Sequence, residues 1–194
     1  SVKEYQERVP LRNYAALHET YLGPHFPHYE GILTNNSIRY LAKSSGTSSG
    51  DAKYVPFSDV SIEGSKRTAT AQVLFAVAKL GTARPFSRPF LSLADKTPLD
   101  DLSPTVRGGL VSNILGQELP WLARRRAMQA YKDGQNLGPD EKLERTVDKA
   151  ISTDLGVITA LTPWLLNLLE RCLEVSGKSN LREIWKNLRI LGHG

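Results

Sequence analysis

The C-terminal stretch constrains the fold of the chain more than any other part. Residues 155–160 form an apolar, β-branched run, which predicts a buried strand. A helix is expected next, with Thr162 as its N-terminal cap and Pro163 at its first position. Gly177 is expected to end this helix. A short second helix and a further strand at 188–191 follow. Because strands that alternate with helices in this way form parallel sheets, the order predicts an α/β fold, with a mostly parallel sheet flanked by helices.

The remaining segments carry weaker signals. A helix is expected after Ser58, which would cap its N-terminus, and Gly81 is expected to end it. Asn180 and Glu183 are expected to form a capping box at the start of the short second helix. Gly64, near the start of the first of these helices, is expected to weaken it by about 1 kcal/mol. The segments expected elsewhere are helical turns at 5–8 and 14–21, strands at 38–43 and 53–57, strands or extended stretches at 89–93 and 110–115, and helices at 118–131 and 140–152.

The composition is that of a soluble globular protein of one domain, or of two small ones. The chain has 194 residues, of which 40% are hydrophobic and 23% charged, so disorder and low complexity are excluded. No apolar run approaches the roughly 18–20 residues that a membrane span needs, because polar residues interrupt the longest candidate, 161–173. The single cysteine excludes an intrachain disulfide, and the polar N-terminus has no signal-peptide core. We therefore expect a cytoplasmic protein.

The excess of basic residues does not by itself indicate a nucleic-acid surface. The formal net charge is +5, and the densest basic run, Arg124, Arg125 and Arg126, falls in a predicted helix. Nucleic-acid binding would need further basic residues interleaved with exposed aromatic ones, or a recognisable motif, and the sequence has neither. A solvated helix face explains the run better than a phosphate-binding patch, so we expect no nucleic-acid or membrane partner.

The other reactive residue types form no pattern that carries chemistry. His18, His25 and His28 are near one another in sequence, but prolines interrupt any helix that would align them, so no metal ligand is assigned. Cys172 has leucine and glutamate neighbours rather than a base, which favours a buried apolar role over that of a nucleophile. The adjacent aspartates at 100–101 project differently, and the second could begin a turn. No catalytic residue is therefore assigned.

The most informative stretch is a polar loop between two predicted strands. Two glycines four residues apart let the backbone turn sharply and point its N–H groups into one concavity, and the hydroxyls between them add short donors. Lys53 supplies a cation where the second strand begins. Donors with a cation suit the phosphates of a nucleotide. The residues concerned are Ser44, Ser45, Gly46, Thr47, Ser48, Ser49, Gly50 and Lys53.

This loop differs from the common phosphate-binding motifs. A Walker A loop needs a lysine directly after its second glycine and a helix afterwards, whereas Lys53 lies three residues past Gly50 and enters a strand. The glycines do not have the spacing of a dinucleotide-binding fingerprint either. A surface hairpin with turn-forming residues explains the composition equally well. Composition alone leaves both interpretations open.

The order of residues in the loop resembles that of a known enzyme family. Residues 40–56, YLAKSSGTSSGDAKYVP, look like the first ATP-binding motif of adenylate-forming enzymes, in the variant of the auxin-responsive acyl acid amido synthetases and their bacterial relatives. Residues 8–14 are similar to the family's segment ahead of that loop. Residues 168–178, 184–190 and 193–194 resemble its helix, helix and strand before the acyl and adenine pocket. The resemblance runs over most of the chain, in order, and is specific at the loop.

The resemblance implies an activity and its site residues. Such enzymes use ATP and Mg²⁺ to convert a small carboxylic acid to an acyl adenylate, and then pass the acyl group to an amine such as an amino acid. By this resemblance, residues 44–50 and Lys53 would hold the phosphates of ATP. The helix that carries Trp164, Leu165 and Leu168 would line the acyl-acid pocket, although core packing is the preferred interpretation of each residue taken singly. Transfer to a thiol such as coenzyme A is the runner-up.

Family members are far longer than this chain. The resemblance therefore implies that residues 1–194 are the N-terminal portion of an adenylation domain, inactive without the second and third motifs and the C-terminal domain. The alternative from a different class is a non-catalytic nucleotide-binding or interaction fragment. A reading frame that continues into an acidic second motif would favour the enzyme, and a stop codon would favour the fragment.

We expect the 194-residue chain to self-associate. A piece of a domain that ends on an unpaired strand leaves apolar surface and an open sheet edge. Sedimentation at rising protein concentration should therefore show oligomers. A chain that stays monomeric at high concentration, without apolar surface accessible to a dye, would contradict its interpretation as a fragment.

Overall fold

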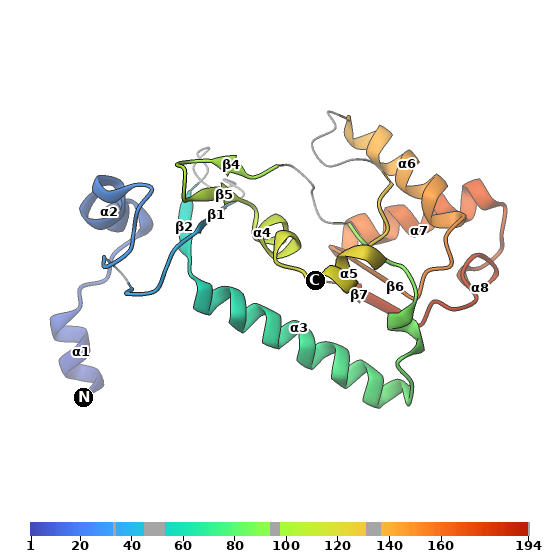
Figure 1. The fold of residues 1–194 in the computed structure, drawn as a ribbon, viewed down its shortest axis with the longest axis horizontal. Coiled ribbons are helices and arrows are strands. Elements are labelled where there is room, and N and C mark those ends of the chain that lie inside the picture. Colours follow the sequence, from blue (N-terminus) through green and yellow to red (C-terminus); the bar gives the residue numbers. More distant parts are fainter. Residues whose placement is uncertain (33, 45–52, 94–97, 131–136, 194) are drawn as a thin grey trace. The chain divides into compact units, whose positions relative to one another are not determined.

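The chain forms two compact units in the computed structural model, which describes residues 1–32, 34–44, 53–93, 98–130 and 137–193 (Figure 1). The first unit comprises residues 1–61 and 100–108, and the second comprises residues 62–99 and 109–194. Each unit has an apolar core of its own. In the described ranges, no helix has the length and hydropathy of a membrane span.

The first unit combines short helical segments with a small sheet. Its helical segments are α1 (Val2–Arg8), α2 (Tyr14–Leu17), a π-helical turn (His18–Leu22) and a 3-10 turn (Gly23–His25). Its described strands, in the sheet order β2-β1-β5-β4, are β2 (Tyr54–Phe57), β1 (Tyr40–Lys43), β5 (Arg107–Gly109) and β4 (Asp100–Asp101). The buried side chains of its core are Leu22, Tyr29, Ile38, Leu41 and Val106.

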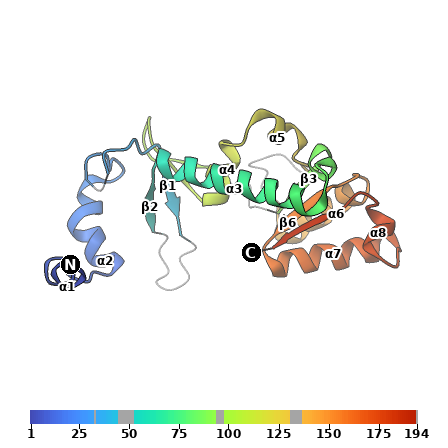
Figure 2. The ribbon, with the colours of Figure 1, turned by 90° about the horizontal axis from the view of Figure 1, so that it is seen from below.

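Strands β1 and β2 form an antiparallel pair (Figure 2). Tyr40 lies opposite Phe57, and Lys43 lies opposite Tyr54. Because side chains alternate along a strand, Leu41 and Lys43 share one face of β1. Leu41 is fully buried, and Lys43 is partly exposed. Tyr40, on the opposite face, is 4% exposed, so both faces of β1 are covered at its start.

Helix α3 (Asp59–Leu80) follows β2 and is the longest described helix. The hydroxyl of Ser58 accepts a hydrogen bond from the Ser61 backbone N–H at 3.3 Å, which is the predicted N-terminal cap. Gly81 adopts the left-handed backbone conformation, with φ of 65°, directly after the last helical residue. Of the 22 residues of α3, only Ile62 is buried.

The second unit carries a parallel sheet with helices around it. The described strands run in the order β3 (Phe90–Ser92), β6 (Val157–Ala160) and β7 (Ile190–His193), and β6 pairs in parallel with both neighbours. The helical segments, in chain order, are a 3-10 turn (Arg84–Ser87), α4 (Val111–Gln117), α5 (Trp121–Arg126), α6 (Pro139–Ile151), α7 (Thr162–Ser176) and α8 (Leu181–Ile184).

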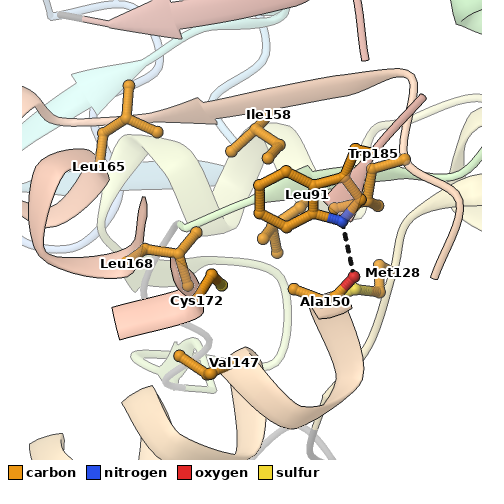
Figure 3. Packing of buried hydrophobic residues seen from close by; sticks show 10 residues of the cluster. Leu91, Met128, Val147, Ala150, Ile158, Leu165, Leu168, Cys172 and Trp185 are labelled. Carbon is orange, nitrogen blue, oxygen red and sulfur yellow. Dashed lines mark hydrogen bonds between the residues drawn. The ribbon is translucent and has the colours of Figure 1, made fainter. Parts of the chain in front are cut away.

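The core of the second unit gathers around Trp185 (Figure 3). The indole is 1% exposed, and its Nε1–H donates a hydrogen bond of 2.8 Å to the Ala150 carbonyl at the end of α6. Ile158 of β6 and Leu168 of α7 are fully buried in the same cluster. Burial of each such aliphatic side chain contributes about 1.5–3 kcal/mol, so these contacts hold the helices against the sheet.

The α/β class predicted from the sequence is confirmed, and so are most of the predicted elements. The strand predicted at 155–160, the helix that Gly177 ends and the strand at 188–191 correspond to β6, α7 and β7. The Oδ1 of Asn180 accepts hydrogen bonds from Arg182 N and Glu183 N and so caps α8. The antiparallel sheet of the first unit adds to the predicted parallel one.

Three details of the sequence prediction are wrong. Most of the stretch 110–115, expected to be extended, belongs to α4, because the Leu110 carbonyl accepts hydrogen bonds from Asn113 N and Ile114 N, one turn further on, and so starts a helix. The helix expected over 118–131 is only α5, because Met128 N leaves the helical pattern and donates to Phe90 O of β3 at 2.7 Å. Helix α7 begins at Thr162 with Leu161 as its N-cap residue, so Thr162 is not the cap.

The close approach of the chain at Gly156 gives a stability prediction. A Cβ atom at this position would collide with the backbone carbonyl of Pro85, while Gly156 N also donates to Pro89 O at 3.0 Å. Because the obstacle is a backbone carbonyl rather than the end of a flexible side chain, Gly156→Ala should lower the free energy of unfolding by about 1–3 kcal/mol. Denaturant titration followed by circular dichroism measures the change.

The matched control is Gly64→Ala in the interior of α3. No atom lies within 4 Å of a Cβ at that position, so the substitution should raise helix stability by up to about 1 kcal/mol. If Gly156→Ala were as stable as Gly64→Ala, the backbone contact at Pro85 would not be tight.

Candidate functional site

The ends of β1 and β2 bring together the two ends of the polar loop. Ser44 N donates to the Lys53 carbonyl at 2.9 Å, and Lys53 N donates to the Ser44 hydroxyl at 3.1 Å. This pair continues the antiparallel ladder by one step beyond Lys43 and Tyr54. The loop therefore leaves one strand and returns directly into its neighbour, which is the β–loop–β arrangement expected from the sequence.

Ser44 and Lys53 are the two predicted phosphate-binding residues that the structure describes. The other six, Ser45, Gly46, Thr47, Ser48, Ser49 and Gly50, lie outside the described residues.

The Lys53 side chain carries a cation without an opposing carboxylate in the described part of the chain. Its Nζ lies 5.2 Å from the centre of the Tyr14 ring, over the face of that ring. The ring attracts the ammonium weakly and leaves its three N–H donors available. Among the ion pairs that the described residues form, none includes Lys53. Lys53 is therefore able to meet an incoming anion.

Lys43, at the other end of the loop, has its charge balanced. Its Nζ lies 3.5 Å from Oδ2 of Asp100, which also accepts a hydrogen bond of 2.9 Å from the Tyr54 hydroxyl. The nearby Tyr54 oxygen and the Asp100 carboxylate raise the pKa of Lys43. Burial, followed by the hydrogen bond to Asp100, raises the pKa of Tyr54, so its hydroxyl stays protonated and donates at neutral pH.

Two further tyrosines pack behind the loop ends. The Tyr14 hydroxyl donates to the Tyr54 carbonyl at 3.1 Å and ties α2 to the first residue of β2. Tyr29 is fully buried, and its hydroxyl has no hydrogen-bond partner among the described residues. Burial, with a smaller contribution from Tyr14, raises the pKa of Tyr29 to about 12. Sequence reasoning found none of these tyrosines, although Tyr54 stands next to Lys53 in the motif.

The matches to known proteins bear on this same region. Residues 1–93, which include β1, β2 and Lys53, match the GH3 family N-terminal domain. The solved structure described as the AtGH3.15 acyl acid amido synthetase in complex with 2,4-DB superimposes with a TM-score of 0.64, over 90% of this chain. The first 93 residues of this chain are therefore similar to the GH3 family N-terminal domain.

The extent of these matches limits what they show. Sequence identity to the AtGH3.15 acyl acid amido synthetase is 13%, so the superposition shows a shared fold. The chain described here spans 31% of the length of that protein. None of the curated proteins matches the chain by sequence.

The three residues expected to line an acyl pocket lie on α7, in the second unit. Leu165 and Leu168 are buried in the core, with 6% and 0% of their surfaces exposed, whereas Trp164 is 52% exposed. Packing therefore accounts for the two leucines, and only the Trp164 side chain offers surface to another molecule.

The arginine run and His18, also considered from the sequence, make contacts within the fold. Arg124 donates to the backbone carbonyls of Gln117 and Leu119, and Arg126 donates to that of Phe86, so two of the three arginines hold chain segments together. The ring of His18 packs against that of Tyr14 at 5.6 Å. In the described ranges, no three His, Cys, Asp or Glu side chains are placed to hold a metal ion.

Burial of Cys172 predicts a thiol that does not react in the folded chain. The side chain is fully buried in α7, and desolvation raises its pKa to about 12. Burial favours the neutral thiol, so its contribution to stability is complete below the unfolded pKa of about 8.5 and is lost as the pH rises toward about 12. Because the chain has one cysteine, a disulfide reagent gives an unambiguous signal: no reaction with native protein at neutral pH and one equivalent in denaturant. Fast reaction of the native protein would contradict this burial.

Proposed function

We propose that the protein to which this chain belongs is an ATP-dependent, acyl-adenylate-forming ligase that transfers its acyl group to an amine such as an amino acid. The observation that carries the proposal is the loop closed by Ser44 and Lys53, with a lysine ammonium at its second end that pairs with no carboxylate among the described residues. The match of residues 1–93 to the GH3 family N-terminal domain and the fold shared with an acyl acid amido synthetase support it. The described chain would supply the phosphate-binding part of the site.

The proposed reaction has two steps. A carboxylate oxygen of the acid attacks the α-phosphorus of ATP, a new P–O bond forms, and the bond to the β-phosphate breaks with release of pyrophosphate. The amine then attacks the acyl carbon, gives up a proton, and displaces AMP. Activation is needed because AMP is a far better leaving group than hydroxide, and catalysis consists largely of holding carboxylate and α-phosphate in line.

The role proposed for the loop is to hold the β- and γ-phosphates. Backbone N–H groups and hydroxyls of residues 44–50 would donate to the phosphate oxygens, and the Lys53 ammonium would add a charge-assisted hydrogen bond. Lys53 fits this role because no described carboxylate neutralises it. Mg²⁺ would arrive with ATP as part of the substrate, since the described residues form no metal-binding group.

The acyl acid is proposed to contact α7 through Trp164. Leu165 and Leu168 would shape this region from within the core, since both are buried there. An exposed indole beside buried leucines offers an apolar surface to the acyl chain of a small carboxylic acid.

Exchange of labelled pyrophosphate into ATP, dependent on an added carboxylic acid, tests the first step in the full-length protein. Lys53→Ala should weaken it, because loss of a charge-assisted hydrogen bond to phosphate costs roughly 1.5–3 kcal/mol. Gly46→Val should be worse, because it adds a β-branched side chain to the glycine-containing loop. Both variants should keep a native circular dichroism spectrum.

Lys3→Ala is the matched control, because it removes an exposed cation from the same unit and should leave exchange unchanged. If Lys53→Ala and Gly46→Val exchanged pyrophosphate as fast as the wild type, the loop would be a simple surface turn. Release of AMP that depends on a thiol and not on an amino acid would assign the second step to a thiol ligase instead.

A further inference from the structure

Side chains from three strands of the first unit meet beside the two ends of the polar loop, and a glycine of the fourth strand makes room for them. Tyr54 comes from β2, Lys43 from β1 and Asp100 from β4, and Gly108 belongs to β5 between them in the sheet. The Tyr54 hydroxyl reaches across the inner strands to Asp100, at 2.9 Å. We call Lys43, Tyr54 and Asp100 the neck cluster.

Because Gly108 has no side chain, the Tyr54 ring can lie against the backbone at that position. A Cβ atom at this position would lie 2.6 Å from Tyr54 Cε1 and 2.8 Å from Leu102 Cδ1, both closer than side-chain atoms tolerate. Any residue other than glycine would therefore push the ring away from the sheet. The path from Tyr54 to Asp100 depends on this missing side chain.

Asp100 joins the two ends of the loop through a single carboxylate. Lys43 is the last residue of the strand that leads into the loop, and Tyr54 is the first residue of the strand that leaves it. The two are register partners, and Oδ2 of Asp100 contacts the Lys43 Nζ at 3.5 Å and the Tyr54 hydroxyl at 2.9 Å. The contact neutralises Lys43 while Lys53, ten residues later, keeps its charge available.

Tyr54 is also held through its backbone. The Tyr14 hydroxyl donates to the Tyr54 carbonyl at 3.1 Å, and the face of the Tyr14 ring lies 5.2 Å from the Lys53 Nζ. The main chain of Lys53 is hydrogen-bonded to Ser44. Its neighbour Tyr54 is held by Asp100 at its hydroxyl and by Tyr14 at its carbonyl. The backbone is therefore held on both sides of the Lys53 side chain, whose ammonium lies over the Tyr14 ring.

We propose that Asp100, through Tyr54 and Lys43, is a positioning residue for nucleotide binding, which directs the Lys53 ammonium toward the terminal phosphates of ATP. The inference rests on the proposed function, because it takes ATP as the ligand. Preorganisation of this kind strengthens binding by reducing the ordering that a ligand must impose on the chain. Loss of the neck cluster should therefore weaken the binding of ATP and spare AMP, which lacks the β- and γ-phosphates.

Isothermal titration of the full-length protein with Mg-ATP and with AMP tests the inference. Asp100→Ala and Tyr54→Phe should each raise the Kd for ATP about 3- to 10-fold, the range expected for loss of a hydrogen bond to a charged group. The double variant should bind ATP as tightly as whichever single variant binds it less tightly, because both substitutions remove the same contact. Asp100→Asn, which still accepts the Tyr54 hydrogen bond but cannot pair with Lys43, should fall between wild type and Asp100→Ala. The Kd for AMP should change less than about 2-fold in every case.

Asp101→Ala is the matched control. Asp101 is the next residue of β4, is exposed, and lies opposite Arg107 rather than in the neck cluster. It should bind both nucleotides like the wild type.

The possible outcomes separate this inference from the proposed function. Unchanged ATP affinity in Asp100→Ala and Tyr54→Phe, or equal weakening of ATP and AMP, would overturn the positioning role. ATP binding that weakens in the neck-cluster variants, in a wild-type protein that catalyses no acid-dependent pyrophosphate exchange, would overturn the proposed function and leave the inference standing. Wild-type protein that binds no ATP would overturn both.

Discussion

The candidate site depends on the antiparallel pairing of β1 with β2. That pairing places Ser44 against Lys53, so the polar loop must begin and end at one point of the sheet. Closing a loop in this way has an entropic cost, which the ladder hydrogen bonds and the burial of Leu41 offset before a ligand is present. A phosphate loop between a strand and a helix uses the helix N-terminus as an anion site, whereas the loop proposed for this role has the cation of Lys53 at its end.

Most of the second unit could be predicted from the sequence because its signals are local. The β-branched run at 155–160 and the glycine at 177 specify a strand and a helix end without reference to distant residues. The stretch 110–115 was ambiguous because a short apolar run fits a buried strand as well as a helix. The end of α5 could not be predicted, since it is set by the hydrogen bond from Met128 to Phe90, a partner far away in the sequence.

For the candidate site, the sequence identified the loop ends but not their supports. Ser44 and Lys53 belong to a continuous motif, and so they could be found from the order of residues alone. Asp100 is 46 positions from Tyr54, and Tyr14 is 40 positions from it, and neither stands in a pattern that signals a role. Strands β4 and β5 are short and contain aspartate and glycine, which are poor strand formers, so only pairing with their neighbours makes them strands.

Helix α3 has a consequence for the dynamics of the chain. With Ile62 as its one buried residue, the helix gains little from tertiary packing, and its backbone hydrogen bonds must rely on intrinsic helix propensity and on the Ser58 cap. Amide protons along its later turns should therefore exchange with solvent deuterium through local fraying, without global unfolding. Those of β6, at the centre of the parallel sheet, should exchange only when the second unit opens as a whole.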